Sequence, residues 1–204
     1  MRRITGIAAA RRILSRNALV AEDLPPRVKE KVKAVFGKPL TAEEAVRRIV
    51  DDVREHGDAA LRHYARVIDG VEVKDFRVSR AEMRAATREV SLELLSALRF
   101  ASARVRDYHV SCRENSEAAF YDSGVGRRVQ PLDRVGIYVP GGTASYPSTV
   151  LMTVVPARVA GVGEIIICSP PKPDGSLPAV TLAAAEIAGV DAIYKIGGAQ
   201  AIAA

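Results

Sequence analysis

The chain has 204 residues, of which 48% are hydrophobic and 26% charged, and this composition is typical of a soluble globular protein. No run of about 18 apolar residues occurs, and arginines interrupt the short apolar patch near the N-terminus, so we expect no membrane span, no secretory signal and a cytoplasmic location. The net charge of +6 lies entirely in residues 1–35, where nine Lys and Arg stand against three Asp and Glu. Aromatic residues are not interleaved with this charge, so we expect no nucleic-acid binding.

Residues 1–35 are therefore predicted to form a basic N-terminal arm that is solvated or contacts another subunit. At the end of this arm, valines at helical spacing predict a helix over 27–37, with Gly37 as its stop. A nucleic-acid role for the arm is the weaker alternative, and salt-sensitive DNA binding would support it.

Residues 36–130 are predicted to be a helical region that ends in a small β-hairpin. Thr41 and Glu44 have the spacing of a capping box, and Asp58 is expected to cap the helix that follows. Ser79 and Glu82 form a second capping box before a long helical segment with a possible break. Around the turn in "YDSGVG" the pattern changes to alternation, which predicts the hairpin.

Residues 131–204 are predicted to be a Rossmann-like β-α-β-α-β half. Three apolar runs of strand length, "RVGIYVP", "EIIICSPP" and "DAIYKIGG", are separated by two mostly apolar helical segments. Strands that are apolar at every position are typical of a parallel sheet covered by helices on both faces. Pro156 falls inside the first helical segment and is expected to kink it or to mark a join between two helices. The fold class is therefore α/β, with the half sheet incomplete at the C-terminus.

Paired glycines end the first and third strands, in "PGG" at 140–142 and "GGAQ" at 197–200. Such turns bring backbone close to a ligand at the carboxyl edge of a parallel sheet, although tight turns alone can require glycine. Two of them at one edge favour a ligand site. Tyr138 at the first strand end could reach a bound ring, and Gln200 could present a donor and an acceptor. Core packing and helix capping are the respective alternatives.

The remaining chemistry-bearing residues predict no catalytic or metal site within the chain. His56, His63 and His109 lack the pair spacing of a metal site, and structural or solvent roles are favoured. Cys112 and Cys168 are far apart, and Cys168 lies in a buried strand, so neither a disulfide nor a nucleophilic thiol is expected.

The phrases "GIYVPGGTASYPSTVLMTVVPARVAGV", "ICSPP" and "AGVDAIYKIGGAQAIAA" resemble the nicotinamide-binding region of the histidinol dehydrogenase family. The upstream "VREHGDAALRHYARVIDG" and "RVRDYH" are similar to the same family in the same order, so the resemblance covers nearly the whole chain.

The resemblance implies a homodimeric, zinc-dependent enzyme that oxidises L-histidinol to L-histidine through histidinal with NAD⁺. It implies NAD contacts at Tyr138 and Gln200. The zinc ligands, the Glu-His pair and an asparagine of the family lie beyond Ala204, so we expect this chain to be an N-terminal portion that supplies the cofactor side and lacks turnover alone.

Two alternatives remain open. One is a relative of the same family that oxidises another small alcohol, such as a sulfonated diol. The other is a non-catalytic module that binds NAD or another subunit.

Overall fold

The computed structural model describes residues 5–8, 11, 24–116, 119–141 and 144–204. They divide into two compact units, residues 1–51 and 52–204. Much of the predicted basic arm lies outside the described residues, and so do Gly142 and Thr143 of the first glycine turn. The division of the chain into domains at residues 1–35, 36–130 and 131–204 remains a prediction. None of the helices in the described part combines the length and apolar content that a bilayer-spanning helix needs.

The first unit contains α2 (Pro26–Phe36) and the start of α3 (Ala42–His56). α2 begins with proline, whose missing N–H is not needed at a helix start, and ends at Gly37 with a left-handed φ of 71°. The first predicted capping box is confirmed: the hydroxyl of Thr41 accepts from the backbone N–H of Glu44 at 3.2 Å, and the carboxylate of Glu44 accepts from the backbone N–H of Thr41 at 2.8 Å.

In the second unit, α4 (Asp58–Tyr64) continues into a single π-helical turn, η1 (Ala65–Asp69). The prediction that Asp58 caps α4 is wrong, because Gly57 occupies the cap position with a φ of 53° and no side-chain cap bond forms. Asp58 is instead the first helical residue, where its charge complements the positive end of the helix dipole.

Two further helices, α5 (Arg80–Glu89) and α6 (Leu92–Glu114), confirm the long helical segment and its break. Ser79 and Glu82 form the predicted capping box at the start of α5. The break falls at Val90 and Ser91, and the hydroxyl of Ser91 accepts from the backbone N–H of Leu94 at 3.2 Å to start α6.

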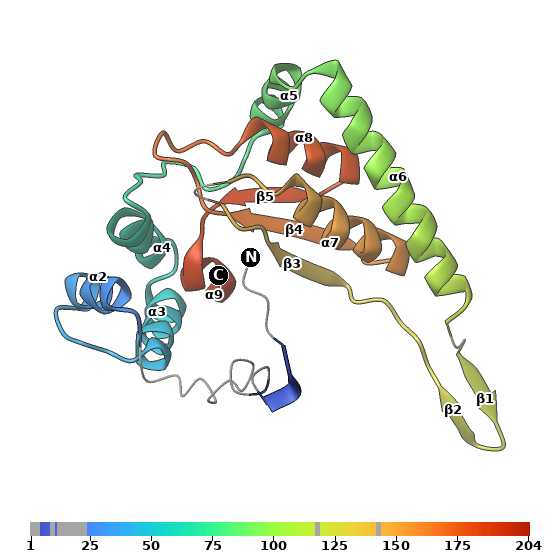
Figure 1. Ribbon diagram of the computed structural model, residues 1–204, viewed down its shortest axis with the longest axis horizontal. Helices are drawn as coiled ribbons and strands as arrows, with labels where there is room; N and C mark the ends of the chain where they lie inside the picture. Colours follow the sequence, from blue (N-terminus) through green and yellow to red (C-terminus); the bar gives the residue numbers. More distant parts are fainter. Residues whose placement is uncertain (1–4, 9–10, 12–23, 117–118, 142–143) are drawn as a thin grey trace. The chain divides into compact units, whose positions relative to one another are not determined.

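A short antiparallel hairpin follows, made of β1 (Phe120–Asp122) and β2 (Val125–Arg127). Its two turn residues, Ser123 and Gly124, have φ of 49° and 85°, which matches the turn twist that two-residue hairpins require. The hairpin extends away from the main sheet (Figure 1), and Phe120 is 57% exposed.

The predicted Rossmann-like half is confirmed. β3 (Arg134–Tyr138), β4 (Glu164–Ser169) and β5 (Ala192–Lys195) pair in parallel in the order β3-β4-β5. α7 (Pro147–Ala160) and α8 (Ala179–Ala188) connect them, and α9 (Gly198–Ala203) follows β5. α7 runs through Pro156 as one helix. α5 and α6 contact α8, and α6 also contacts α7 (Figure 1).

The core lies between one face of this sheet and helices α7 and α8. Ile165, Ile167 and Ile193 are buried there with Val150 and Val154. Helices were expected to cover both faces of the sheet. Among the described residues, this expectation is confirmed for the face that α7 and α8 cover. On the other face Ile166, Cys168 and Tyr194 are half-buried and line a pocket of about 480 Å³ with residues of α4 and α9.

Candidate functional site

The candidate site lies at the carboxyl edge of the three parallel strands, where each strand is followed by a turn that contains proline or glycine. Tyr138 ends β3 and pairs in register with Cys168 of β4. Ser169 ends β4 and leads into Pro170, and β5 leads into Gly197 and Gly198. Because the strands are parallel, these three turns meet at one edge, which is where open α/β sheets bind ligands.

The two glycine turns flank the ring of Pro170. A Cβ built on Gly141 would lie 2.9 Å from the Cγ of Pro170, and one on Gly197 would lie 2.5 Å from its Cβ. Both glycines therefore have a packing reason in this structure. The ligand interpretation of the turns consequently depends on the polar atoms beside them rather than on the glycines themselves.

Tyr138 connects the first strand end to the third. Its side chain is 36% exposed, and its hydroxyl accepts a hydrogen bond of 3.1 Å from the backbone N–H of Gly198. Gly198 has a left-handed φ of 67°, a conformation that favours glycine. The two turns are thereby joined at the edge of the sheet.

Gln200 is fully buried on α9, with 0% of its side chain exposed. Its Nε2 donates to the carboxylate of Asp69 at 3.4 Å. Its Oε1 has no hydrogen-bond partner among the described residues. A Cβ on Gly198 would lie 2.4 Å from this oxygen, so any side chain at residue 198 would displace the amide. A buried carbonyl without a donor is costly, so this oxygen is an open acceptor that a water or a ligand donor can satisfy.

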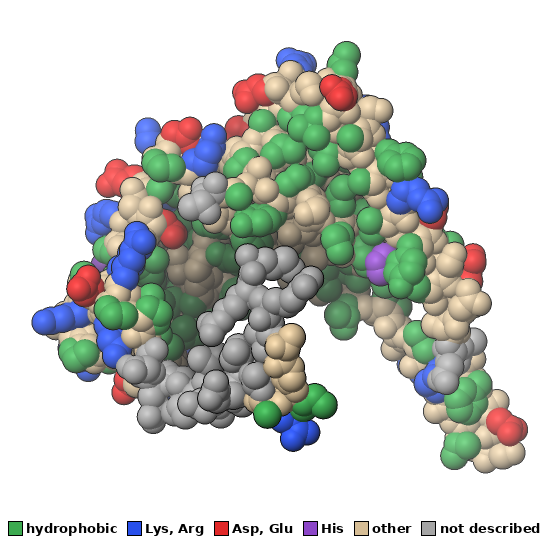
Figure 2. Space-filling view, viewed as in Figure 1, with side chains coloured by type: hydrophobic (Ala, Val, Ile, Leu, Met, Phe, Trp, Pro, Cys, Tyr) green, Lys and Arg blue, Asp and Glu red, His purple; other side chains and the backbone are tan. Residues whose placement is uncertain are grey.

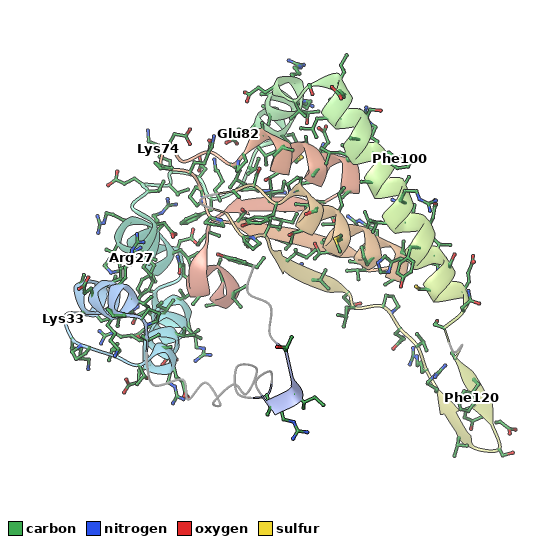
Figure 3. The ribbon with its side chains drawn as sticks, in the orientation of Figure 1. Arg27, Lys33, Lys74, Glu82, Phe100 and Phe120 are labelled. Atoms are coloured by element: carbon green, nitrogen blue, oxygen red, sulfur yellow. The ribbon has the colours of Figure 1, made fainter. Side chains whose placement is uncertain are left out.

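A large groove among the described residues lies elsewhere. A groove of about 1000 Å³ follows the outer side of β5 and is lined by charged residues that include Lys74 and Glu82, labelled in Figure 3. It contains neither Tyr138 nor Gln200. We place the candidate site at the strand ends because an unpaired buried acceptor is more informative about ligand chemistry than the size of an open groove.

An ion pair ties the helices to β5 beside that groove. The ammonium of Lys195 lies 2.8 Å from the carboxylate of Glu82. The hydrogen bond from Lys195, followed by the one from the backbone of Ser79, lowers the pKa of Glu82 from 4.5 to about 2. The start of α5 is therefore anchored to the end of β5.

The described residues contain no group of three or more His, Cys, Asp and Glu side chains that could hold a metal ion. The Nδ1 of His56 lies 3.2 Å from the carbonyl oxygen of Asp52 in its own helix. His63 and His109 pack edge-on against Tyr64 and Tyr108. These are local contacts at separate places along the helices.

The sequence patterns missed two residues of the candidate site, Asp69 and Pro170. Asp69 is 131 residues from Gln200 in the chain and reaches it from the π-helical turn η1. Pro170 read only as the end of a strand. No spacing pattern in the sequence connects Asp69 with the strand ends, or Pro170 with the two glycine turns.

The fold and the strand-end site define a Rossmann-like α/β protein with its ligand edge at the carboxyl ends of β3, β4 and β5. The family model for histidinol dehydrogenase matches residues 37–204. The chain therefore belongs to the histidinol dehydrogenase family.

Individual relatives agree. The chain is 51% identical over 162 residues to a histidinol dehydrogenase of Geobacillus kaustophilus, covering 78% of this chain and 38% of the relative. It is 44% identical over 201 residues to one of Dehalococcoides mccartyi, covering 98% of this chain and 46% of the relative. The crystal structure of histidinol dehydrogenase from Elizabethkingia anophelis matches 89% of this chain and 42% of its own, with a TM-score of 0.74 and 32% identity. The chain thus spans less than half the length of these relatives.

Proposed function

We propose that this chain is the cofactor-binding part of an enzyme that oxidises L-histidinol through histidinal to L-histidine with NAD⁺, in histidine biosynthesis. Membership of the family supports the reaction class. The observation that carries the cofactor part is the buried, unpaired Oε1 of Gln200 at the edge of a parallel sheet.

The residues at this edge fit a dinucleotide in chemistry. NAD⁺ carries ribose hydroxyls and amide and amine N–H groups that can donate to Oε1 of Gln200, and its rings can stack on a partly exposed tyrosine such as Tyr138. When bound, NAD⁺ accepts a hydride from the substrate. The residues of this chain bind and orient the cofactor. Because Gln200 is fully buried, a ligand reaches its carbonyl only after the residues that cover it rearrange locally.

Binding of NAD⁺ is tested directly by calorimetric titration of the chain. We expect Tyr138→Ala and Gln200→Ala each to weaken binding by about tenfold, the loss of one good polar or stacking contact, while circular dichroism shows a folded chain. Tyr108→Ala is the matched control, since Tyr108 is 66% exposed on α6, away from the strand ends. Equal binding by all four proteins would remove the strand-end site from the proposal.

We propose zinc as a cofactor of the whole enzyme, and not of the residues described in this chain. The described residues offer no group suited to a metal ion, so no step is assigned to zinc here. We further propose that the 204-residue chain has no turnover alone. A steady-state assay with L-histidinol, NAD⁺ and added Zn²⁺ checks this, and sustained NADH production would contradict it.

Homodimer formation is a further part of the proposal. Apolar side chains are visible along α6 among polar and charged ones (Figure 2), and Phe100 there is 70% exposed and points outward (Figure 3). Exposed apolar groups of this kind favour a subunit contact. Sedimentation should show a dimer that Phe100→Ser weakens, and a monomer at all concentrations would contradict the assembly.

A further inference from the structure

Asp69 determines which atom of Gln200 is left for a ligand. A carboxylate only accepts hydrogen bonds, so the group that Gln200 turns toward Asp69 has to be its amino nitrogen, Nε2. The carbonyl oxygen Oε1 then faces the other way and stays unpaired among the described residues.

The backbone around Asp69 supports a positioning role. Asp69 ends the π-helical turn η1, and the next residue, Gly70, takes a left-handed φ of 72°. π-helical turns are rare and occur frequently at functional sites. Here the turn interrupts the regular run of α4 and brings the carboxylate of Asp69 to a residue 131 positions later in the chain.

Gly198 limits the amide from the opposite side. A Cβ there would lie 2.4 Å from Oε1, and 3.1 Å from Nε2, of Gln200. The amide therefore lies between the carboxylate of Asp69 and the bare backbone of Gly198. Its orientation is set by two residues rather than left free to rotate.

We propose that Asp69 is a positioning residue that holds Gln200 with Oε1 presented as a hydrogen-bond acceptor, so that the ligand group it meets is a donor. This rests on the proposed NAD⁺ site and deepens it. Ribose hydroxyls and amide N–H groups qualify as the donor, whereas a pyrophosphate, which has only acceptor oxygens, does not.

The test combines NMR with titration of NAD⁺ into the 204-residue chain. Asp69→Asn keeps the shape but adds a donor, which lets the Gln200 amide turn around. Asp75→Asn is the matched control, an exposed aspartate on the neighbouring loop with the same charge change. The side-chain amide signals of Gln200 are identified as the pair that disappears in Gln200→Met.

We expect Asp69→Asn to shift the Gln200 amide signals and to weaken NAD⁺ binding about threefold to tenfold, the range for one hydrogen bond. Asp75→Asn should do neither, and binding of inorganic pyrophosphate should be the same in all variants. Unchanged Gln200 signals in Asp69→Asn would overturn the positioning role. The positioning role would also be overturned if Asp69→Asn shifted the Gln200 signals but bound NAD⁺ as tightly as the wild type, while Gln200→Met bound it more weakly.

Failure of the proposed function has a different signature. A wild-type chain that shows no NAD⁺ binding, although its Gln200 signals still respond to Asp69→Asn, overturns the cofactor site and the donor preference with it. The contact between Asp69 and Gln200 would then be structural only.

Discussion

The ring of Pro170 occupies the space in which a side chain on Gly197 would have to lie. The turn after β5 can therefore pass close to the turn after β4 only because residue 197 has no side chain. This contact also fixes where Gly198 and its bond to Tyr138 are placed.

Gly197→Ala is expected to destabilise the chain by about 1–3 kcal/mol, because the new methyl group overlaps a rigid ring and the backbone must move. Gly136→Ala is the control, since nothing lies within 4 Å of a Cβ built there. It should be neutral or stabilise slightly. Urea unfolding followed by circular dichroism measures both, and equal stabilities would contradict the contact with Pro170.

The two faces of β4 predict different effects for neighbouring isoleucines. Ile167 has 0% of its surface exposed, facing α7 and α8, so Ile167→Ala should cost about 2–5 kcal/mol. Ile166 faces the half-open side and lines the smaller pocket, so Ile166→Ala should cost clearly less. Thermal and urea unfolding distinguish the two, and a larger loss for Ile166 would mean that the open face is covered.

Acid sensitivity is expected from the ion pair of Glu82 and Lys195. The folded-state pKa of Glu82 is lowered from 4.5 to about 2, so its contribution is present above pH 4.5 and is lost as the pH falls toward 2. Because Glu82 is 46% exposed, we expect about 1 kcal/mol rather than the full linkage value. Glu82→Gln should flatten the stability profile in this window, while Glu89→Gln, on the same helix, should leave the profile as in the wild type.

The two thiols should react at different rates. Burial raises the pKa of the Cys168 thiol, which leaves less of the reactive thiolate at neutral pH, whereas Cys112 is exposed on α6. With a chromogenic disulfide reagent we expect a fast phase that disappears in Cys112→Ser and a slow phase that disappears in Cys168→Ser. The opposite assignment would show that the face carrying Cys168 is open to solvent.

The parallel half sheet could be predicted because its strands and helix ends are each marked by a local sequence pattern. The stretch 165–168 in the second strand is apolar at every position, and glycines such as Gly161 and Gly189 end the intervening helices at left-handed φ. What the pattern could not show is how evenly the two faces are covered. An isoleucine packed on a helix and one beside a pocket look the same in sequence.

The candidate site was only partly predictable. Tyr138 was predicted from its place at a strand end and Gln200 from its place after a glycine pair, and the structure places both next to Gly198. The contact from Asp69 was missed because it depends on a π-helical turn, for which residue propensities give no signal. The burial of Gln200 was also missed, since a glutamine near a glycine turn is usually expected to face solvent.

Finally, β3 has consequences for handling the protein. Among the described strands it pairs only with β4, so one side of its backbone presents N–H and C=O groups without strand partners there. An edge of this kind is a template for β-strand addition by another molecule. Strand addition between copies would become more frequent at higher protein concentration, so we expect dilute storage to protect a purified sample from aggregation.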